Sequence, residues 1–134
     1  METTISISVD ETLRQIYAES AWRVALKASE GKSEPRLTKD NRALLMVKFG
    51  EGYDSLCRKI MGYVSDYDDG RFLQGEAKTV IKPAHEYPSA TIRSIRGAME
   101  QYLVVYVLWA MYGDEKYSAS CQNCVARLLN LLAS

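Results

Sequence analysis

The sequence predicts a mainly α-helical protein, a four-helix bundle-like domain with a small two-stranded β element, in which residues 1–134 form one domain. Three observations carry this prediction. Apolar residues recur at alternating steps of three and four along several long segments, which is the spacing of one helix face. Two short segments read as strands of a half-buried sheet. The length suits a single domain that buries its own core.

The first strand and the first helix follow directly on one another. Thr4–Val9 alternates between polar and apolar residues, and this pattern predicts a strand. Ser8 and Glu11 then match a capping box, in which the Ser8 hydroxyl accepts a hydrogen bond from the Glu11 amide. The helix ends at Gly31–Pro35, within a polar segment that predicts a mobile connection. Its apolar stripe consists of Leu13, Ile16, Tyr17, Ala21, Val24 and Ala28.

The second helix is expected after a cap at Thr38 or Asp40. Two glycines, Gly50 and Gly52, lie inside it and together cost about 1–2 kcal/mol relative to alanine. They predict either the close approach of a neighbouring helix or a bend in this one. The stripe of this helix consists of Met46, Phe49, Tyr53, Leu56, Ile60 and Tyr63.

The middle of the chain predicts a turn and the second strand. Residues 66–70 are acidic and end in glycine, which is typical of a turn. Glu76–Lys82 predicts a strand that stops at Pro83. The acidic turn does not match a calcium loop, because the fifth and twelfth positions counted from Asp66 are Gly70 and Ala77.

The third helix is the clearest in the chain. It is expected to begin at Ser89, and its second half, residues 103–112, is apolar on every side. Such a helix is covered on several faces, either by its own domain or by another subunit. Gly113 ends it, and Asp114 is placed to cap the last helix. The stripe of the third helix consists of Ile92, Ile95, Met99, Tyr102, Tyr106 and Trp109.

Cys121 and Cys124 form a Cys-x-x-Cys pair on the last helix. A thioredoxin-type site needs its first thiol at the N-terminus of a helix that follows a strand. Cys121 instead lies well inside a helix, and no strand is predicted before it. The spacing places both residues on the core-facing stripe, where cysteine acts as a small apolar side chain. The stripe consists of Tyr117, Cys121, Cys124, Leu128 and Leu131.

A zinc site is the alternative for these cysteines. A Cys₃His site would need Cys57, Cys121, Cys124 and His85, which are all the thiol and imidazole ligands of the chain. Structural zinc sites usually pair closely spaced ligands at both ends, whereas Cys57 and His85 are single residues. We expect no bound metal and no cofactor, and a metal assay on the purified protein decides this point.

Charge and composition exclude several classes of function. The 17 basic and 17 acidic residues give no net attraction to nucleic acid or to an anionic membrane. The most apolar run, residues 103–112, is shorter than the roughly 20 residues of a membrane-spanning helix. No signal peptide and no phosphate-binding loop or nucleophile motif is evident. The sequence therefore predicts a cytoplasmic protein without catalytic residues, which is not an enzyme.

The last third of the chain predicts a protein interface. From residue 97 onward only five side chains are charged, and aromatic residues are frequent. Tyrosine and tryptophan are favoured at interfaces because they bury a large area and retain a polar group. The candidate interface residues are Tyr102, Tyr106, Trp109, Tyr112, Leu128 and Leu132.

The order of elements also carries a resemblance to a group of known proteins. A short strand precedes a helix with Tyr17-Ala-Glu-Ser-Ala-Trp22, and a later strand ends in Val80-Ile-Lys-Pro83. A helix with Tyr102-Leu-Val-Val-Tyr-Val-Leu-Trp109 and a closing helix complete the chain. This layout resembles the small structural proteins encoded beside virion genes in tailed-phage and prophage clusters. It is similar to the helical head–tail connector or neck proteins.

The resemblance implies a non-enzymatic protein that assembles into a ring or packs against portal or tail components. It implies no catalytic residues, and it places the protein in the cytoplasm or in a virion. The partners would be other copies of the chain or portal-like and tail-like proteins. The connections at 31–35 and 66–75 would be the segments that become ordered on assembly.

A second hypothesis remains open at this point. The chain is then a small regulatory or ligand-binding helical domain with an aromatic pocket. The expected pocket residues are Tyr53, Tyr63, Tyr102 and Trp109.

Overall fold

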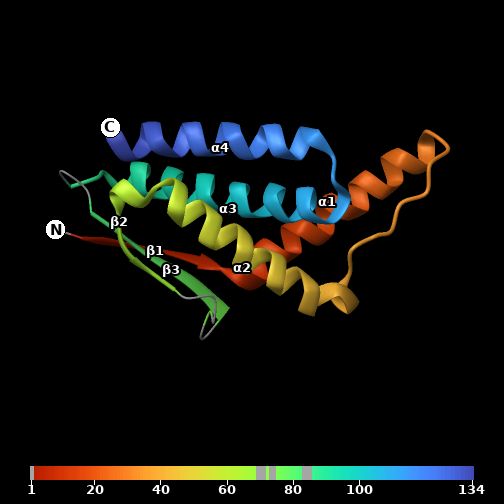
Figure 1. Cartoon of the computed structure of the whole chain (residues 1–134), viewed down its shortest axis with the longest axis horizontal. Helices are drawn as coiled ribbons and strands as arrows, with labels where there is room; N and C mark the ends of the chain where they lie inside the picture. Colours follow the sequence, from red (N-terminus) through yellow and green to blue (C-terminus); the bar gives the residue numbers. More distant parts are fainter. Residues whose placement is uncertain (1, 69–71, 73–74, 83–85) are drawn as a thin grey trace.

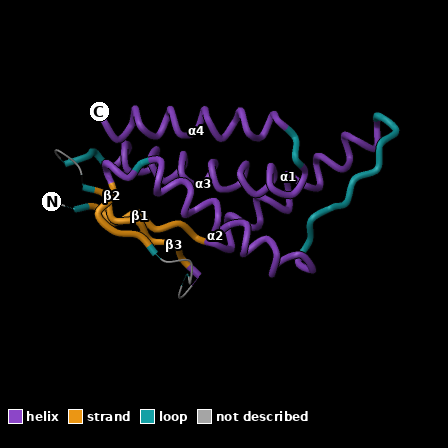
Figure 2. The backbone as a smooth tube through the Cα atoms, in the orientation of Figure 1, coloured by secondary structure: helices purple, strands orange, loops and turns teal. Residues whose placement is uncertain are grey.

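The computed structural model describes residues 2–68, 72, 75–82 and 86–134, and Figure 1 shows its arrangement. Four helices and three strands are present in this part of the chain, so the mainly helical fold is confirmed. Figure 2 shows that the strands gather on one side of the molecule. The elements are β1 (Thr3–Ser8), α1 (Val9–Ser29), α2 (Arg42–Lys59), β2 (Val64–Tyr67), β3 (Glu76–Ile81), α3 (Ser89–Tyr112) and α4 (Glu115–Ala133).

The sheet has three antiparallel strands in the order β1-β3-β2, so the prediction of two strands is wrong. β2 occupies Val64–Tyr67, where the sequence predicted the start of a turn; residues 69 and 70 of that turn lie outside the described part. The segment Val-Ser-Asp-Tyr is short and polar, so it has no apolar alternation to reveal it. Its pairing with β3 is irregular between Val64 and Asp66, which is typical of an edge strand.

Helix α3 lies at the centre of the fold. The helices α1, α2 and α4 all pack against it, and β1 contacts it as well. Figure 1 shows α4 running along α3, with the sheet on the side of the molecule away from α4. The apolar second half of α3 is therefore covered by its own chain, one of the two explanations that the sequence left open. The helices α1, α2 and α4 thus share α3 as their common packing partner. The predicted four-helix bundle-like arrangement is not confirmed.

The sheet faces the helices with one apolar side, on which Ile5, Ile7, Ala77 and Ile81 are fully buried. Tyr53 of α2 anchors this face. Its hydroxyl donates to the Lys78 carbonyl and lies 2.6 Å from both that oxygen and the Thr79 hydroxyl oxygen. A phenol has one proton, so the Thr79 hydroxyl is the donor in the second bond. These bonds fix α2 across β3.

The residues that the sequence predicted at the helix ends cap the helices as expected. The Ser8 hydroxyl accepts a hydrogen bond from the Glu11 amide at 3.2 Å, and Asp114 accepts one from the Lys116 amide at 3.1 Å. Gly113 adopts the left-handed conformation, with φ 68°, that ends α3. Thr38 caps the short 3₁₀ turn at 39–41 that precedes α2.

The connection from α1 to α2, which the sequence predicted to be mobile, is fastened to the helices at its far end. Tyr112 donates a hydrogen bond of 2.7 Å to the Pro35 carbonyl, and the Leu37 amide donates one of 2.7 Å to the Ser20 hydroxyl. Leu37 itself is buried. The connection therefore belongs to the packed structure from Pro35 onward.

Gly52 explains why glycine lies in the middle of α2. A Cβ atom at this position would lie 2.6 Å from Cδ1 of Tyr106 on α3. The ring of Tyr106 thus packs directly against the backbone of α2, and the close approach of two helices is the correct one of the two predicted explanations. At Gly50 the nearest atom to such a Cβ belongs to Phe72, at an ordinary 3.8 Å.

We predict that Gly52→Ala destabilises the protein by about 1–2 kcal/mol, because the added methyl group displaces the Tyr106 ring. Gly97→Ala is the matched control. Gly97 lies on the exposed side of α3, where a Cβ atom would have nothing within 4 Å, and alanine is expected to add about 0.5–1 kcal/mol of stability there. Denaturant unfolding measures both changes.

A double variant tests the stated cause. In a Tyr106→Ala background the extra methyl group of Gly52→Ala has room, so its cost is expected to disappear. A Gly52→Ala protein that is as stable as the parent would refute the close approach of α2 and α3.

Candidate functional site

A groove of about 600 Å³ runs between α2, α3 and α4, and we call it the α2–α4 groove. α2 contributes Ser55 and Lys59 to its lining, and α3 contributes three aromatic residues. The longest wall comes from α4, whose lining residues are Ser118, Cys121, Gln122, Val125, Ala126 and Leu129.

The aromatic wall of this groove is continuous. The rings of Tyr102 and Tyr106 are nearly parallel, with centroids 6.0 Å apart, and the Trp109 ring follows at 5.8 Å from Tyr106. Tyr102 is buried, Tyr106 is half-buried, and Trp109 is 40% exposed. The wall thus leads from the core to the surface and offers ring faces to an apolar group.

Polar groups in the groove are few. The Ser55 and Tyr102 hydroxyl oxygens lie 3.2 Å apart and satisfy one another. Lys59 is the one charged residue of the lining. It makes no ion pair within the described part of the chain. The groove is therefore mainly apolar, with Ser118 and Gln122 as further polar residues on α4, and it carries one positive charge.

The three cysteines are protonated thiols in this environment. Burial raises the pKa of the Cys121 thiol to about 11 and that of the Cys57 thiol to about 12, and it also raises the pKa of Cys124. Because the thiolate is the nucleophile and the metal ligand, these side chains act as small apolar groups. His85 lies outside the described residues. Among those that are described, no cluster of three or more His, Cys, Asp or Glu is arranged to hold a metal ion.

The structure places the six candidate interface residues in three different environments. Tyr102, Tyr106 and Trp109 line the α2–α4 groove. Leu128 and Leu132 lie in the core of the chain itself, with 0% and 3% exposure. The sixth residue faces α1 instead, as described below.

The aromatic pocket expected from the sequence is formed only in part. Tyr102 and Trp109 line the groove, whereas Tyr53 is buried beneath the sheet and Tyr63 follows α2 in a 3₁₀ turn. Neither Tyr53 nor Tyr63 belongs to the lining. Sequence reasoning missed Lys59 and the apolar residues of the α4 wall. The signal that could have found them was the spacing of Ser118, Gln122, Val125 and Leu129, which form a second helical stripe beside the core-facing one.

A second groove lies on the other flank of α4, between α1, α3 and α4, and we call it the α1–α4 groove. Its volume is about 330 Å³. Trp22 and Leu26 of α1 line it and are 71% and 43% exposed. Glu19 and Lys116 are the exposed charged residues of its lining.

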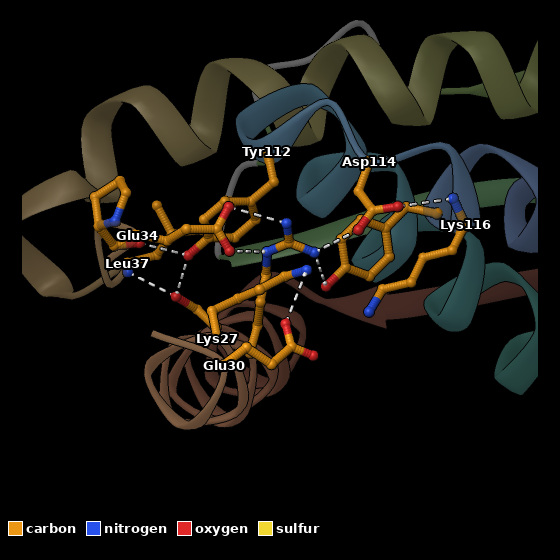
Figure 3. Close-up of polar contacts among 11 residues, drawn as sticks. Lys27, Glu30, Glu34, Leu37, Tyr112, Asp114 and Lys116 are labelled. Carbon is orange, nitrogen blue, oxygen red and sulfur yellow. Dashed lines mark hydrogen bonds and ion pairs between the residues drawn. The ribbon is translucent and has the colours of Figure 1, made fainter. Parts of the chain in front are cut away.

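Arg23 lines the α1–α4 groove and is only 5% exposed. Figure 3 shows Glu34, Tyr112 and Asp114 gathered in this network of polar contacts. Its Nε and Nη2 atoms each lie 2.9 Å from an oxygen of Glu34, and Nη1 donates to Asp114 at 2.8 Å. The guanidinium also lies over the ring of Tyr112, 4.7 Å from its centroid. Tyr112, the sixth candidate interface residue, is bonded through its hydroxyl to Ser20 and Pro35.

We call Arg23, Glu34, Tyr112 and Asp114 the Arg23 cluster. It joins α1, the connection that follows α1, and the corner between α3 and α4. Burial alone would lower the pKa of the Arg23 guanidinium, but its bonds to Glu34 and Asp114 raise it overall. The bond from Arg23, followed by that from the Lys116 amide, lowers the pKa of Asp114. Arg23 and Asp114 therefore keep their charges at neutral pH. The cluster fixes the corner between α3 and α4 against α1, which is a structural role.

We predict that Arg23→Met lowers the free energy of unfolding by about 3 kcal/mol, because Glu34 and Asp114 lose their shared counter-ion. The two carboxylates retain some contact with water, which keeps the cost at the low end for a buried pair. Arg42→Met is the control, since the exposed ion pair of Arg42 with Asp10 is expected to contribute less than about 1 kcal/mol. Equal effects in denaturant unfolding would contradict the structural role of Arg23.

Thiol labelling tests the environment of the cysteines. At pH 8 we expect Cys121 of the folded protein to react with a thiol reagent about twentyfold more slowly than free cysteine. A pKa near 11 lowers the thiolate fraction roughly 200-fold, and the greater nucleophilicity of that thiolate offsets about tenfold of the loss. The rate rises as the pH approaches 11. In denaturant all three cysteines should react at the rate of the free amino acid. Fast labelling of folded Cys121 at pH 7 would refute its description as a buried, protonated thiol.

Comparison of this chain with models of protein families, with curated proteins and with solved structures gave no match. In the described ranges no helix combines the length and the apolar character that crossing a membrane requires. The function is therefore inferred from the grooves themselves.

Proposed function

We propose that this chain is a non-enzymatic structural or assembly protein that binds a protein partner through the α2–α4 groove. The observation that carries the proposal is the open aromatic wall formed by Tyr102, Tyr106 and Trp109. Large aromatic side chains set in a groove are typical of the energetically dominant part of a protein interface. Trp109 is one of the large apolar side chains that remain exposed, at 40%.

The length of the groove favours a protein segment as its occupant. The α4 wall extends from Ser118 to Leu129, which is about 17 Å at 1.5 Å per residue. That distance accommodates about three turns of helix. Packing of an amphipathic helix into an apolar groove is a common mode of peptide recognition.

The chemistry of the lining also favours binding over catalysis. It supplies the paired hydroxyl groups of Ser55 and Tyr102, a protonated thiol at Cys121 and one lysine. General acid–base or nucleophilic catalysis uses groups whose pKa is brought toward neutrality. In this groove burial moves the thiol pKa further from neutrality.

The layout of the chain suggests the biological setting of this assembly role. We extend the proposal to a head–tail connector-like component of a phage or prophage, with portal-like or tail-like proteins or other copies of the chain as partners. The protein would remain in the cytoplasm until it is built into a virion. Terminase, portal and tail genes beside its gene would support this setting, and their absence would count against it.

A small-molecule function is the second candidate, and the same groove favours it. A volume of about 600 Å³ falls in the usual range of ligand sites, and Lys59 would attract an anionic group. Such a ligand would be apolar with one acidic group, and it would be released as a distinct mass when the purified protein is denatured.

Site-specific photo-crosslinking tests the proposal. A photoreactive residue at the position of Gln122, which is exposed and lines the groove, should capture a partner protein in the native cells. The same residue at the position of Asn123, which is exposed but outside the lining, is the matched control and should capture none. Val125→Glu should abolish capture at Gln122 while leaving the fold intact by circular dichroism.

The crosslinking results distinguish the assembly role from the ligand-binding role. Equal capture at both positions would show that the groove is not the binding surface. No captured protein, together with a released small molecule, would replace the assembly role with the ligand-binding one.

A further inference from the structure

We infer that the α2–α4 groove receives the exposed ridge of helix α1 from a second copy of this chain. We call this the α1 ridge and define it as Glu19, Trp22 and Leu26. The inference rests on the proposed function and names the partner of the same groove. It predicts that copies join head to tail.

The α1 ridge has the form of a helix that lacks a partner. Its residues are spaced by three and four, so they lie on one face of α1. Trp22 is 71% exposed and Leu26 43% exposed, although both are large apolar side chains. Figure 1 shows the C-terminal end of α1 projecting past the corner between α3 and α4, where a second molecule can reach it. Tryptophan is strongly enriched among the residues that dominate binding energy.

The charges of the ridge and the groove are complementary. Lys59 is the one charged residue that lines the α2–α4 groove, and Glu19 is the one charged residue of the ridge. Both are exposed, and neither makes an ion pair with another residue of the described ranges. Docking of the ridge would give each of them a counter-ion at the edge of an apolar contact.

The positions of these charges also agree in register. Gly52 lies against Tyr106, and Ser55 is bonded to Tyr102, so α2 runs opposite to α3 along the groove. Lys59 therefore lies at the end of the groove beyond Tyr102, and Trp109 lies at the other end.

With Glu19 at Lys59, the ridge places Trp22 and Leu26 along the aromatic wall. The ridge is about 10 Å long and the groove about 17 Å, so it fits within the groove.

Because the α1 ridge and the α2–α4 groove lie on different sides of the molecule, the proposed contact can repeat from one copy to the next. The ridge borders the α1–α4 groove, which lies on the opposite flank of α4 from the α2–α4 groove. A copy whose ridge fills its neighbour's groove still has its own groove free on the other flank. Contacts between two different surfaces continue from copy to copy, as a closed ring or a filament. The zero net charge of the chain offers little repulsion against this association.

A charge exchange tests the inference. Sedimentation velocity over a range of concentrations is expected to show reversible self-association of the parent chain. Glu19→Lys and Lys59→Glu should each weaken the association about tenfold, because each places two like charges together. The double variant with both changes should return to within about threefold of the parent, since the opposite charges meet again.

A second pair of variants tests the apolar part of the contact between the α1 ridge and the α2–α4 groove. Trp22→Ala should weaken the association about thirtyfold, as expected for a residue at the centre of an interface. Val47→Ala is the matched control, because Val47 is 56% exposed on α2 and lies outside both groove linings. It should leave self-association unchanged. Unfolding curves of all variants separate lost contacts from lost folding.

Each result bears on the inference separately from the proposed function. A parent chain that stays monomeric at all concentrations, or a double variant that fails to recover, overturns the α1 ridge as the occupant. If the crosslinker at Gln122 then still captures another protein, the assembly role stands without self-association. If it captures nothing, both proposals fail.

Discussion

The enclosure of the apolar side chains of α3 by three other helices and a strand is the constraint from which the rest of the structure follows. Its second half is apolar all round, and each buried leucine or valine contributes about 1.5–3 kcal/mol only while it is covered. The helices α1, α2 and α4 and the strand β1 all contribute to that cover. Because α4 packs mainly on α3, its two flanks stay open, and a groove forms along each. Both candidate binding surfaces are thus a consequence of how one apolar helix is enclosed.

The ion pairs of the Arg23 cluster hold α1 in place against the corner between α3 and α4. A buried guanidinium costs free energy unless it is paired, and here Glu34 and Asp114 supply the compensating charges from two other segments. The pairing fixes α1 relative to the start of α4. It also fixes the backbone beneath Trp22, the residue next to Arg23 in α1. A helix face that is held in place before binding loses little conformational entropy when it docks, which favours association.

The sequence predicted the helices well and the groove poorly, for related physical reasons. Caps at Ser8 and Asp114 and the glycine at 113 act locally, so their signals are complete in a few residues. β2 exists only through pairing with β3, and its four residues carry no pattern of their own. On α4 the spacing placed Leu128 on the core-facing stripe, which is correct, but it did not identify the adjacent stripe with Val125 as the wall of a groove. Gly52 left two explanations open because only the position of Tyr106 decides between them.

Cys121, the first residue of the Cys-x-x-Cys pair, lines the α2–α4 groove, whereas Cys124 does not. Cys121 packs against the core and also lines the groove, so its size sets how deep the groove is. A leucine side chain has two more non-hydrogen atoms than cysteine, and these would extend into the space beside Tyr102 and Tyr106 and fill part of the groove. Cysteine is small enough to keep the aromatic wall accessible and apolar enough to be buried, which its raised pKa reflects. The Cys-x-x-Cys spacing is therefore the spacing of a helix face, on which the small side chain of Cys121 leaves the α2–α4 groove open.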